Sequence, residues 1–451
     1  MIKDRKDQTM KKHLFQAAAV LFVFGLSFTA LAELKLSAEC TKDNALFKTG
    51  ETITFRVMLK KADGSPESGR KLSYTLKGDG GLLKNGEIVS AEKPQELVTR
   101  LDRPGFVLLT VSTKEGKKTL KTWAGAGVEP EKIQPGTPDT PDFDEFWAKE
   151  LKALRSRKIK SEVEPVDDPK IRFGVKVYKV QLDNGEIRAN GYLLIPHDAK
   201  TGTLPIVAMF NGASTIGGFY TATDNMAAQY KALVFNMNLH DVPVDIPRKE
   251  WGKWRKSEEI RDYMFRDTSD PRKYRIFKIF MRVALSLEYL KSRPEWNGKT
   301  IISRGGSLGG AQSLAAAYFE PKVVLCVANA PALCDHFGAD RRQSPGWPNL
   351  FVRLKNQPEE LAAARKTMRY FDMVNFAKRI KCRVAMSTGF IDIVCPPTSD
   401  YAVYNSLSCE KSIVNVVLGM HGLSLKKGEP SVFAVNGPLV ARECAKVRAE
   451  N

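Results

Sequence analysis

The sequence is poor in histidine and lacks the spacings by which histidine and cysteine form a zinc site. Only five of its 451 residues are histidine, and no two of its seven cysteines form a closely spaced ligand pair. Seven is an odd number, so at least one cysteine is free or pairs between chains. Cys326 and several others lie in apolar stretches and are expected to be buried. No metal site and no disulfide are predicted.

The chain also lacks a second long apolar run and any long basic run. Beyond residue 32 no stretch is long and apolar enough to span a membrane, so no stable membrane insertion is expected. The formal net charge is +19, but lysine and arginine are spread along the chain without interleaved aromatic residues. Nucleic acid is therefore not an expected partner. A solvated basic surface is the preferred interpretation, and attraction to an acidic polysaccharide or an anionic cell surface is the alternative.

Residues 1–32 have the pattern of a cleavable signal peptide. A basic segment precedes an apolar stretch at 14–31, and Ala30-Leu31-Ala32 matches a small-residue cleavage site. We expect cleavage near Ala32 and a secreted or periplasmic protein, with an uncleaved anchor as the alternative. Cys40 follows Glu39, so a lipoprotein anchor is not indicated.

The next part of the chain, residues 33–126, is predicted to be all-β. Segments such as 53–59 and 106–111 alternate between apolar and polar residues, and turn-forming clusters separate them. Short strands at regular spacing favour a small sandwich of immunoglobulin type. The segment holds no catalytic constellation, so a spacer, a packing partner or a glycan-binding module are the alternatives. Residues 127–140, rich in proline, glycine and threonine, are predicted to be a linker.

Residues 141–451 alternate between strand and helix patterns, which predicts an α/β domain with a doubly wound, mainly parallel sheet. A hairpin is expected around Asn184-Gly185, and the charged and aromatic stretch 244–275 is expected to be a surface excursion over the site. Strands are expected at 174–182, 187–195, 204–210, 232–237, 300–302, 323–328, 383–388 and 412–418. Helices are expected at 141–155, 274–292, after 310, near 397–407 and near 431–448, and a helical region is expected near 350–378.

The segment 299–317 has the pattern of a nucleophile elbow. Thr300, Ile301 and Ile302 favour a strand, Gly305-x-Ser307-x-Gly309 provides a tight turn, and an alanine-rich helix follows. Small neighbours let the chain pass close to itself, and the helix N-terminus favours negative charge near the serine. The alternative is a glycine-rich turn that only packs or that binds phosphate. Strand and helix on either side favour Ser307 as a nucleophile.

The general base can be found by elimination. In this fold class an acid and then a histidine follow the nucleophile along the chain. Only His336 and His421 follow Ser307. His421 comes just after the strand expected at 412–418, where catalytic residues of open α/β sheets gather. His336 lies too soon after the elbow, so His421 is preferred.

The acid should lie at the end of the preceding strand, and Asp392 does. Asp372 and Asp400 are less well placed and fit a solvated helix surface or a helix cap. In this scheme His421 takes the proton of Ser307, and Asp392 orients the imidazole and stabilises its charged form. Two backbone N–H groups are needed for the oxyanion, and Leu308 and Ala213 are the expected donors.

From about residue 135 to 448 the chain resembles the acetyl xylan esterase / cephalosporin C deacetylase family of α/β-hydrolases. The resemblance rests on Pro141-Asp142-Phe143-Asp144-Glu145-Phe146-Trp147, Asn190-Gly191-Tyr192-Leu193-Leu194-Ile195-Pro196, Ser292-Arg293-Pro294-Glu295, the elbow, and Gly389-Phe390-Ile391-Asp392-Ile393-Val394-Cys395-Pro396-Pro397. It implies an α/β-hydrolase fold with Ser307, Asp392 and His421 as the triad. Family members remove acetyl groups from sugars without a metal or cofactor. Many are oligomers, so a homo-oligomer is an open alternative.

The chain also departs from the family pattern. Leu308 follows the nucleophile where the family has Gln, and Asn211-Gly212-Ala213 replaces His-Gly-Tyr. The family's Arg-Gly-Gln is missing near Leu239, and Gly422 follows the histidine in place of Glu. Backbone donors survive such changes, but the lost Tyr removes an aromatic wall near the acyl group. The β-domain lies outside the family's minimal chain.

These observations predict a secreted serine esterase that removes acetyl or other small acyl groups from carbohydrate. Its expected partner is an acetylated oligo- or polysaccharide, with xylan or a related polymer as the substrate. A broader carboxylesterase or a peptidase of the same fold is one alternative. A non-catalytic glycan-binding protein on a hydrolase scaffold is the other.

Overall fold

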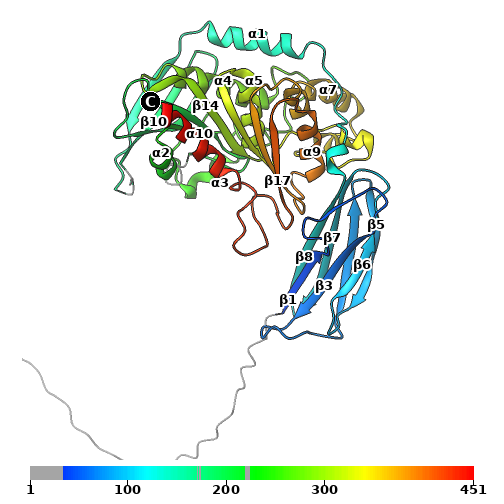
Figure 1. Cartoon of the computed structure of the whole chain (residues 1–451). Helices are drawn as coiled ribbons and strands as arrows, with labels where there is room; N and C mark the ends of the chain where they lie inside the picture. Colours follow the sequence, from blue (N-terminus) through cyan, green and yellow to red (C-terminus); the bar gives the residue numbers. More distant parts are fainter. Residues whose placement is uncertain (1–33, 170, 172–173, 219–223, 451) are drawn as a thin grey trace, which may run out of the picture.

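The computed structural model describes residues 34–169, 171, 174–218 and 224–450, and it forms an N-terminal β-sandwich followed by a larger α/β domain (Figure 1). The expected signal peptide, residues 1–32, lies outside the described residues. Among the helices of the described ranges, none has the length and apolarity that a membrane crossing needs.

The sandwich pairs a sheet of three strands, ordered β1-β3-β6, with a sheet of five, ordered β2-β8-β7-β4-β5. In β3, Ile53, Phe55, Val57 and Leu59 are all buried, because side chains of a strand alternate between its two faces. The strands are β1 (Lys35–Cys40), β2 (Leu46–Phe47), β3 (Ile53–Lys60), β4 (Lys71–Gly78), β5 (Gly81–Val89), β6 (Gln95–Thr99), β7 (Gly105–Glu115) and β8 (Lys118–Val128).

The α/β domain is built on a nine-stranded sheet with the order β17-β16-β15-β14-β12-β13-β11-β10-β9. Strands β12 to β17 run parallel, and β9 to β11 add an antiparallel edge. The expected hairpin is confirmed, with Asp183 of β10 opposite Arg188 of β11. The strands are β9 (Lys160–Pro165), β10 (Val175–Asp183), β11 (Arg188–Pro196), β12 (Leu204–Phe210), β13 (Leu233–Met237), β14 (Trp296–Gly306), β15 (Val323–Asn329), β16 (Arg383–Gly389) and β17 (Lys411–Val416).

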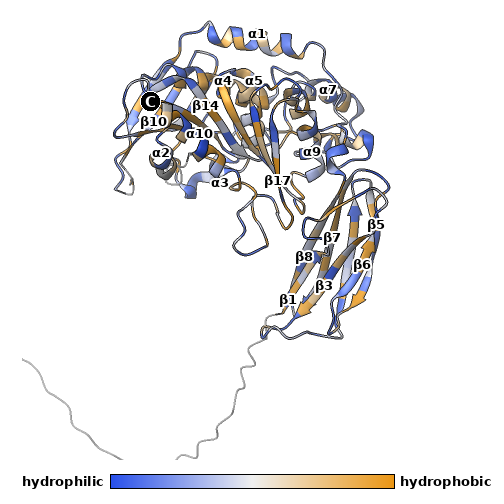
Figure 2. Cartoon of the chain, viewed as in Figure 1, coloured by the Kyte–Doolittle hydropathy of each residue, from blue (hydrophilic) through white to orange (hydrophobic). Residues whose placement is uncertain are grey.

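Helices cover both faces of this sheet. On β14, Ile301 packs into the cluster shared with α4 and α5, whereas its neighbour Ile302 packs into the cluster shared with α2 and α10. Helix α1 lies outside α4 and shows alternating hydrophobic and hydrophilic bands (Figure 2). The helices are α1 (Phe143–Arg155), α2 (Asp224–Tyr230), α3 (Trp251–Trp254), α4 (Arg275–Lys291), α5 (Leu308–Phe319), α6 (Leu350–Arg353), α7 (Pro358–Met368), α8 (Met373–Ala377), α9 (Pro397–Ser406) and α10 (Gly437–Glu450).

Two of the expected helical segments differ in detail from the structure, and proline has a part in both. The last helix begins at Gly437, not at residue 431, because Pro438 lacks an N–H and belongs in a first turn. The region 350–378 holds three short helices, since Pro358 starts α7 and Asp372 caps α8 through the Val374 N–H.

The sandwich is joined to the α/β domain by a tightly packed contact. The ring of Phe106 on β7 meets the ring of Phe390 edge-on, with centroids 5.0 Å apart. The backbone of Phe390 also approaches Gly125 on β8 so closely that an added Cβ would lie 2.4 Å from the Phe390 oxygen. Asp79 accepts hydrogen bonds from the Thr398 hydroxyl at 2.6 Å and from the Phe106 N–H at 2.8 Å. We call residues 389–395 the acid loop, because it carries Asp392.

The segment between the two domains is held by a pair of buried carboxyl groups. Thr137 lies between Asp335 and Asp372, with its Oγ1 2.9 Å from one carboxyl and 2.8 Å from the other. Asp335 also accepts the N–H groups of Gly136 and Thr137 at 2.8 Å. Burial raises the pKa of both carboxyl groups, and repulsion by Asp372 adds to the rise at Asp335. The segment is therefore fixed and does not act as a loose tether.

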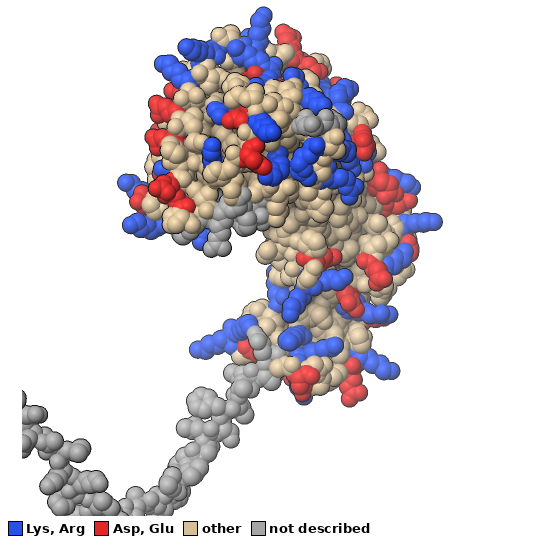
Figure 3. Space-filling model, turned by 60° about the vertical axis from the view of Figure 1, so that its left-hand side comes forward, with Lys and Arg blue, Asp and Glu red and all other residues tan. Residues whose placement is uncertain are grey.

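The sandwich extends past the edge of the large sheet at which the loop after β17 lies (Figure 1). In the view of Figure 3 a hollow separates the α/β domain from the sandwich, and lysine and arginine side chains are spread over both parts among acidic ones. The basic charge is thus distributed and does not form a single patch on this face.

Candidate active site

Ser307 lies at the turn between β14 and α5, as the elbow pattern predicts. Its φ of 58° and ψ of −127° lie outside the regions that non-glycine residues favour. The Ser307 N–H donates to Asn329 O at 3.0 Å, and Ser307 O accepts the N–H of Ala332 at 3.0 Å. These bonds to β15 and the segment after it hold a conformation that costs about 1–3 kcal/mol.

The turn is tight enough to require glycine on both sides of the serine. A Cβ on Gly309 would lie 2.2 Å from the oxygen of Phe210, the last residue of β12. A Cβ on Gly305 would lie 2.4 Å from the Gly309 backbone. Close packing of the elbow against β12 therefore brings Ser307 next to the loop after that strand.

The three expected catalytic side chains form one hydrogen-bonded line. His421 Nε2 lies 3.0 Å from Ser307 Oγ, and His421 Nδ1 lies 2.7 Å from Asp392 Oδ2. The Asp392 carboxylate is fully buried, whereas the His421 side chain is 22% exposed. This is the geometry in which an imidazole can accept the serine proton while a carboxylate holds its second nitrogen.

The acid loop fixes the second oxygen of Asp392. Asp392 Oδ1 accepts the N–H groups of Val394 at 2.8 Å and Cys395 at 3.0 Å, so its carboxylate has partners on both oxygens. The Cys395 thiol lies against the Ser307 hydroxyl, and burial raises its pKa well above the ordinary value, with the Asp400 and Asp392 carboxyl groups adding to the rise. A thiol held neutral does not compete with the serine as a nucleophile.

The two expected oxyanion donors face the same region. A Cβ on Gly212, the residue before Ala213, would lie 3.7 Å from Ser307 Cβ, so the loop after β12 runs beside the nucleophile. Among the described residues, neither the Leu308 N–H nor the Ala213 N–H donates to another group. Gln312 holds the loop by donating to Asn211 O at 3.0 Å. Two unused backbone donors next to a serine suit a developing oxyanion.

A hollow of about 550 Å³ opens over Ser307 and His421. Its walls mix the polar loop after β12 with Trp347, Val394 and Phe433. The Phe433 ring meets the His421 ring edge-on, with centroids 5.2 Å apart, and so limits how the imidazole can tilt. Within the described ranges no group of three or more metal-binding side chains lies close enough together to hold a metal ion.

The structure separates the rejected candidates from this site. His336 is 3% exposed, and both of its ring nitrogens lack a hydrogen-bond partner among the described residues, while burial lowers its pKa to about 4. Asp372 and Asp400 were expected on a solvated helix surface or at a helix cap; both are fully buried, so the solvated surface was wrong for both. Asp372 does cap α8, and Asp400 accepts the Thr388 hydroxyl at 2.7 Å.

Sequence reasoning missed the side chains that support the histidine. Asn329, at the end of β15, donates to Phe433 O at 3.1 Å and accepts from Ser387 at 2.8 Å and Asn436 at 2.9 Å. This buried network ties the segment that carries Phe433 to the ends of two strands. No local pattern marks it, although Asn329 and Ser387 do lie at strand ends, where site residues gather.

Comparisons with known proteins agree with this site. Residues 129–423 match the model of the acetyl xylan esterase family. Acetyl esterase Axe7A of Xylanibacter ruminicola is 30% identical over 434 residues, covering 91% of this chain and 93% of that protein. That match is too long to lie within residues 129–451, so it extends into the β-sandwich.

Solved structures show the same fold. An acetyl xylan esterase from Paenibacillus sp. R4 matches with a TM-score of 0.59 at 24% identity, covering 70% of this chain and 98% of that one. Acetyl xylan esterase 1 from Thermoanaerobacterium sp. JW/SL YS485 matches with a TM-score of 0.56 at 22% identity, covering 71% and 98%. The family match and the long relative confirm the resemblance seen in the sequence: the chain belongs to the acetyl xylan esterase family and is a carboxylic ester hydrolase.

Proposed function

We propose that this protein is a secreted serine esterase that removes acetyl groups from xylan or a related polysaccharide. The observation that carries the proposal is the line from Ser307 through His421 to Asp392 at the floor of an open hollow, in a chain of the acetyl xylan esterase family. Export rests on the sequence of residues 1–32 alone.

The chemistry proceeds through an acyl-enzyme. Ser307 Oγ attacks the ester carbonyl carbon while His421 Nε2 takes the serine proton, and the carbonyl oxygen becomes an oxyanion that accepts the N–H groups of Leu308 and Ala213. Collapse of this intermediate breaks the bond to the sugar oxygen, which leaves as a hydroxyl with the proton from His421. Asp392 keeps Nδ1 protonated and stabilises the imidazolium throughout.

Water then completes the cycle. His421 takes a proton from a water molecule whose oxygen attacks the acetyl carbon on Ser307, and a second oxyanion forms at the same two N–H groups. Its collapse returns the proton to Ser307 Oγ and releases acetic acid. No other group is required for either half of the reaction.

The small side chain of Ala213 in the lining of the hollow favours one second candidate, a carboxylesterase of broader acyl specificity. By the resemblance to the family, Ala213 stands where other members carry a tyrosine, which would add an aromatic wall beside the acyl group. Rates on esters of increasing acyl-chain length separate the two candidates. An acetyl-selective enzyme should cleave a longer acyl ester no faster than an acetate ester.

The test is acetate release from acetylated xylan and acetylated xylo-oligomers, with wild type beside Ser307→Ala. Release by wild type alone supports the proposal. Cleavage of p-nitrophenyl butyrate without acetate release supports the broader carboxylesterase. Inactivity on both substrates, with retained binding of xylo-oligomers, supports a glycan-binding protein on a hydrolase scaffold.

A further inference from the structure

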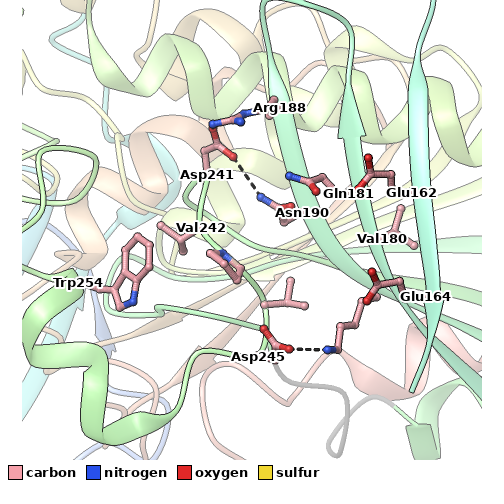
Figure 4. A pocket seen from close by; sticks show the side chains of 13 residues that line it. Glu162, Glu164, Val180, Gln181, Arg188, Asn190, Asp241, Val242, Asp245 and Trp254 are labelled. Carbon is pink, nitrogen blue, oxygen red and sulfur yellow. Dashed lines mark hydrogen bonds and ion pairs between the residues drawn. The ribbon is translucent and has the colours of Figure 1, made fainter. Parts of the chain in front are cut away.

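A second hollow, of about 410 Å³, lies beside the open edge of the large sheet (Figure 4). Strands β9 and β10 form one wall through Glu162 and Gln181, and the segment 241–254 forms the other through Asp241 and Trp254. We call this hollow the edge groove. None of the residues assigned to catalysis contributes to it.

The edge groove lies at the same end of the sheet as the catalytic hollow. Gly191 of β11 pairs with Met237, the last residue of β13, and Met237 pairs with Phe210, the last residue of β12, which lines the catalytic hollow. Asn190, next to Gly191, lines the edge groove. Strand β10 is three strands from β12, and at about 4.8 Å per strand this places the groove roughly 15 Å from the loop beside Ser307. A short oligosaccharide can span that distance.

The chain itself connects the two hollows. The loop after β12 leaves the oxyanion region and donates from Gly218 N to Val244 O, a residue of the edge groove, at 2.8 Å. Ile216 of this loop packs with Val242 in the cluster that also holds Trp254. The aromatic wall of the groove is therefore fixed in place before any ligand binds, and it is attached to the loop that carries Ala213.

Several polar groups of the groove have no protein partner. Within the described part of the chain, the side chains of Glu162, Gln181 and Trp254 make no hydrogen bond or ion pair, although all three line the groove. By contrast, Asn190 donates to Asp241 at 3.2 Å, and Lys179 pairs with Asp245. These pairs join the two walls (Figure 4), while the unpaired groups are available to a ligand.

This combination suits a neutral sugar. A pyranose ring offers an apolar face that can stack on an indole, and hydroxyl groups that both donate and accept. Carboxylate, amide and indole N–H groups supply the matching acceptors and donors. The groove is lined by four carboxylates and by two cations, Lys179 and Arg188. Its net negative charge therefore disfavours an anionic ligand. The described residues hold no three-ligand cluster for a metal ion here.

We propose that the edge groove is a subsite for uncharged sugar residues of the same glycan chain whose acetyl group is hydrolysed at Ser307. The inference rests on the proposed function for the identity of the glycan. The groove would hold a polymer or a longer oligomer, while a small acetate ester would reach Ser307 without contacting it. Uronic acid substituents within the bound stretch would weaken binding, because they would meet the carboxylates.

The first experiment compares kinetics on two substrates. Trp254→Ala and Gln181→Ala should each raise KM for acetylated xylo-oligomers by about five- to tenfold, as expected for loss of a stacking or hydrogen-bonding contact, and leave kcat/KM for p-nitrophenyl acetate unchanged. Trp123→Ala, a tryptophan on the surface of the sandwich, is the matched control and should change neither. Gln181 is exposed, so its variant keeps the fold even where the Trp254 variant loses stability.

The second experiment keeps the groove testable if the proposed function fails. Calorimetric titration of unacetylated xylohexaose into Ser307→Ala should show binding. The double variant Ser307→Ala/Gln181→Ala should bind about five- to tenfold more weakly. If wild type releases no acetate from xylan but xylohexaose still binds, the proposed function is refuted and the subsite proposal stands. An unchanged KM in both groove variants, or an equal loss on the small ester, would overturn the groove.

Discussion

Replacement of Gly125 by alanine should impair catalysis from outside the α/β domain. An added Cβ would lie 2.4 Å from the Phe390 oxygen and 2.8 Å from the Phe390 carbonyl carbon. Ordinary contacts at about 3.5 Å would require the two backbones to separate by about 1 Å. Phe390 precedes Asp392 by two residues, so the displaced segment is the acid loop.

The acid loop has little room to yield. On its other side, Phe390 N donates to Val416 O at 3.1 Å and Ile391 N donates to Gly419 O at 3.1 Å. These bonds lead to the loop that carries His421, so a shift would disturb both partners of Ser307. A misplacement of about 1 Å at a catalytic group can cost on the order of 100-fold in rate, and overpacking costs about 1–3 kcal/mol in stability.

The assay is steady-state hydrolysis of p-nitrophenyl acetate together with urea unfolding. We expect kcat of Gly125→Ala to fall by about 10- to 100-fold with a smaller change in KM. Val111→Ala is the matched control, because Val111 is fully buried in the sandwich core and its truncation costs about 1–3 kcal/mol without touching the acid loop. A Gly125→Ala enzyme with kcat within about twofold of wild type, or a Val111→Ala enzyme equally impaired, would refute the reasoning.

Three further predictions concern the site and its surroundings. Asp392→Asn should lower kcat on p-nitrophenyl acetate by about 10³- to 10⁴-fold with unchanged unfolding, because the amide favours the wrong imidazole tautomer; a loss below tenfold would contradict the role of Asp392. Asn329→Ala should cost about 2 kcal/mol or more in urea unfolding, since it leaves Phe433 O without a donor and one N–H of Asn436 without an acceptor, while Ser387 keeps Val432 O. His336→Gln should reduce the loss of folding stability that acid causes. The pKa of His336 is lowered to about 4 in the folded chain, so wild type loses stability as the pH falls through about 6.5, by about 2 kcal/mol at pH 5. If the urea midpoint of the variant falls between pH 7 and pH 5 as much as that of wild type, this reasoning is contradicted.

The line from Ser307 through His421 to Asp392 could be predicted from the sequence because each of its members follows the carboxyl end of a strand. Ser307 is marked by Gly305 and Gly309 on either side of it. The choice of His421 over His336 needed only the order of the chain segments, because few histidines follow Ser307. The hydrogen bonds of both ring nitrogens agree with that choice. The sheet followed for a similar reason, since buried parallel strands are continuous apolar runs.

Other features carry no local signal. β9 was not predicted, because all its residues are exposed at the edge of the sheet and Lys-Ser-Glu-Val-Glu-Pro has no apolar face. Asp400 is fully buried and accepts the Thr388 hydroxyl, a side-chain contact that no local pattern marks. The contact between Phe106 and Phe390 joins residues 284 positions apart, and neither position differs in pattern from an ordinary core aromatic.

The fixed placement of the sandwich limits the shapes that can approach the catalytic serine. Because Asp79, Phe106 and Gly125 hold it against the α/β domain, it stands beside the catalytic edge as a rigid projection (Figure 1). A flat, crystalline fibre would meet this projection before it met the floor of the hollow. The architecture therefore favours substrates that are narrow enough to enter the hollow beside this fixed projection.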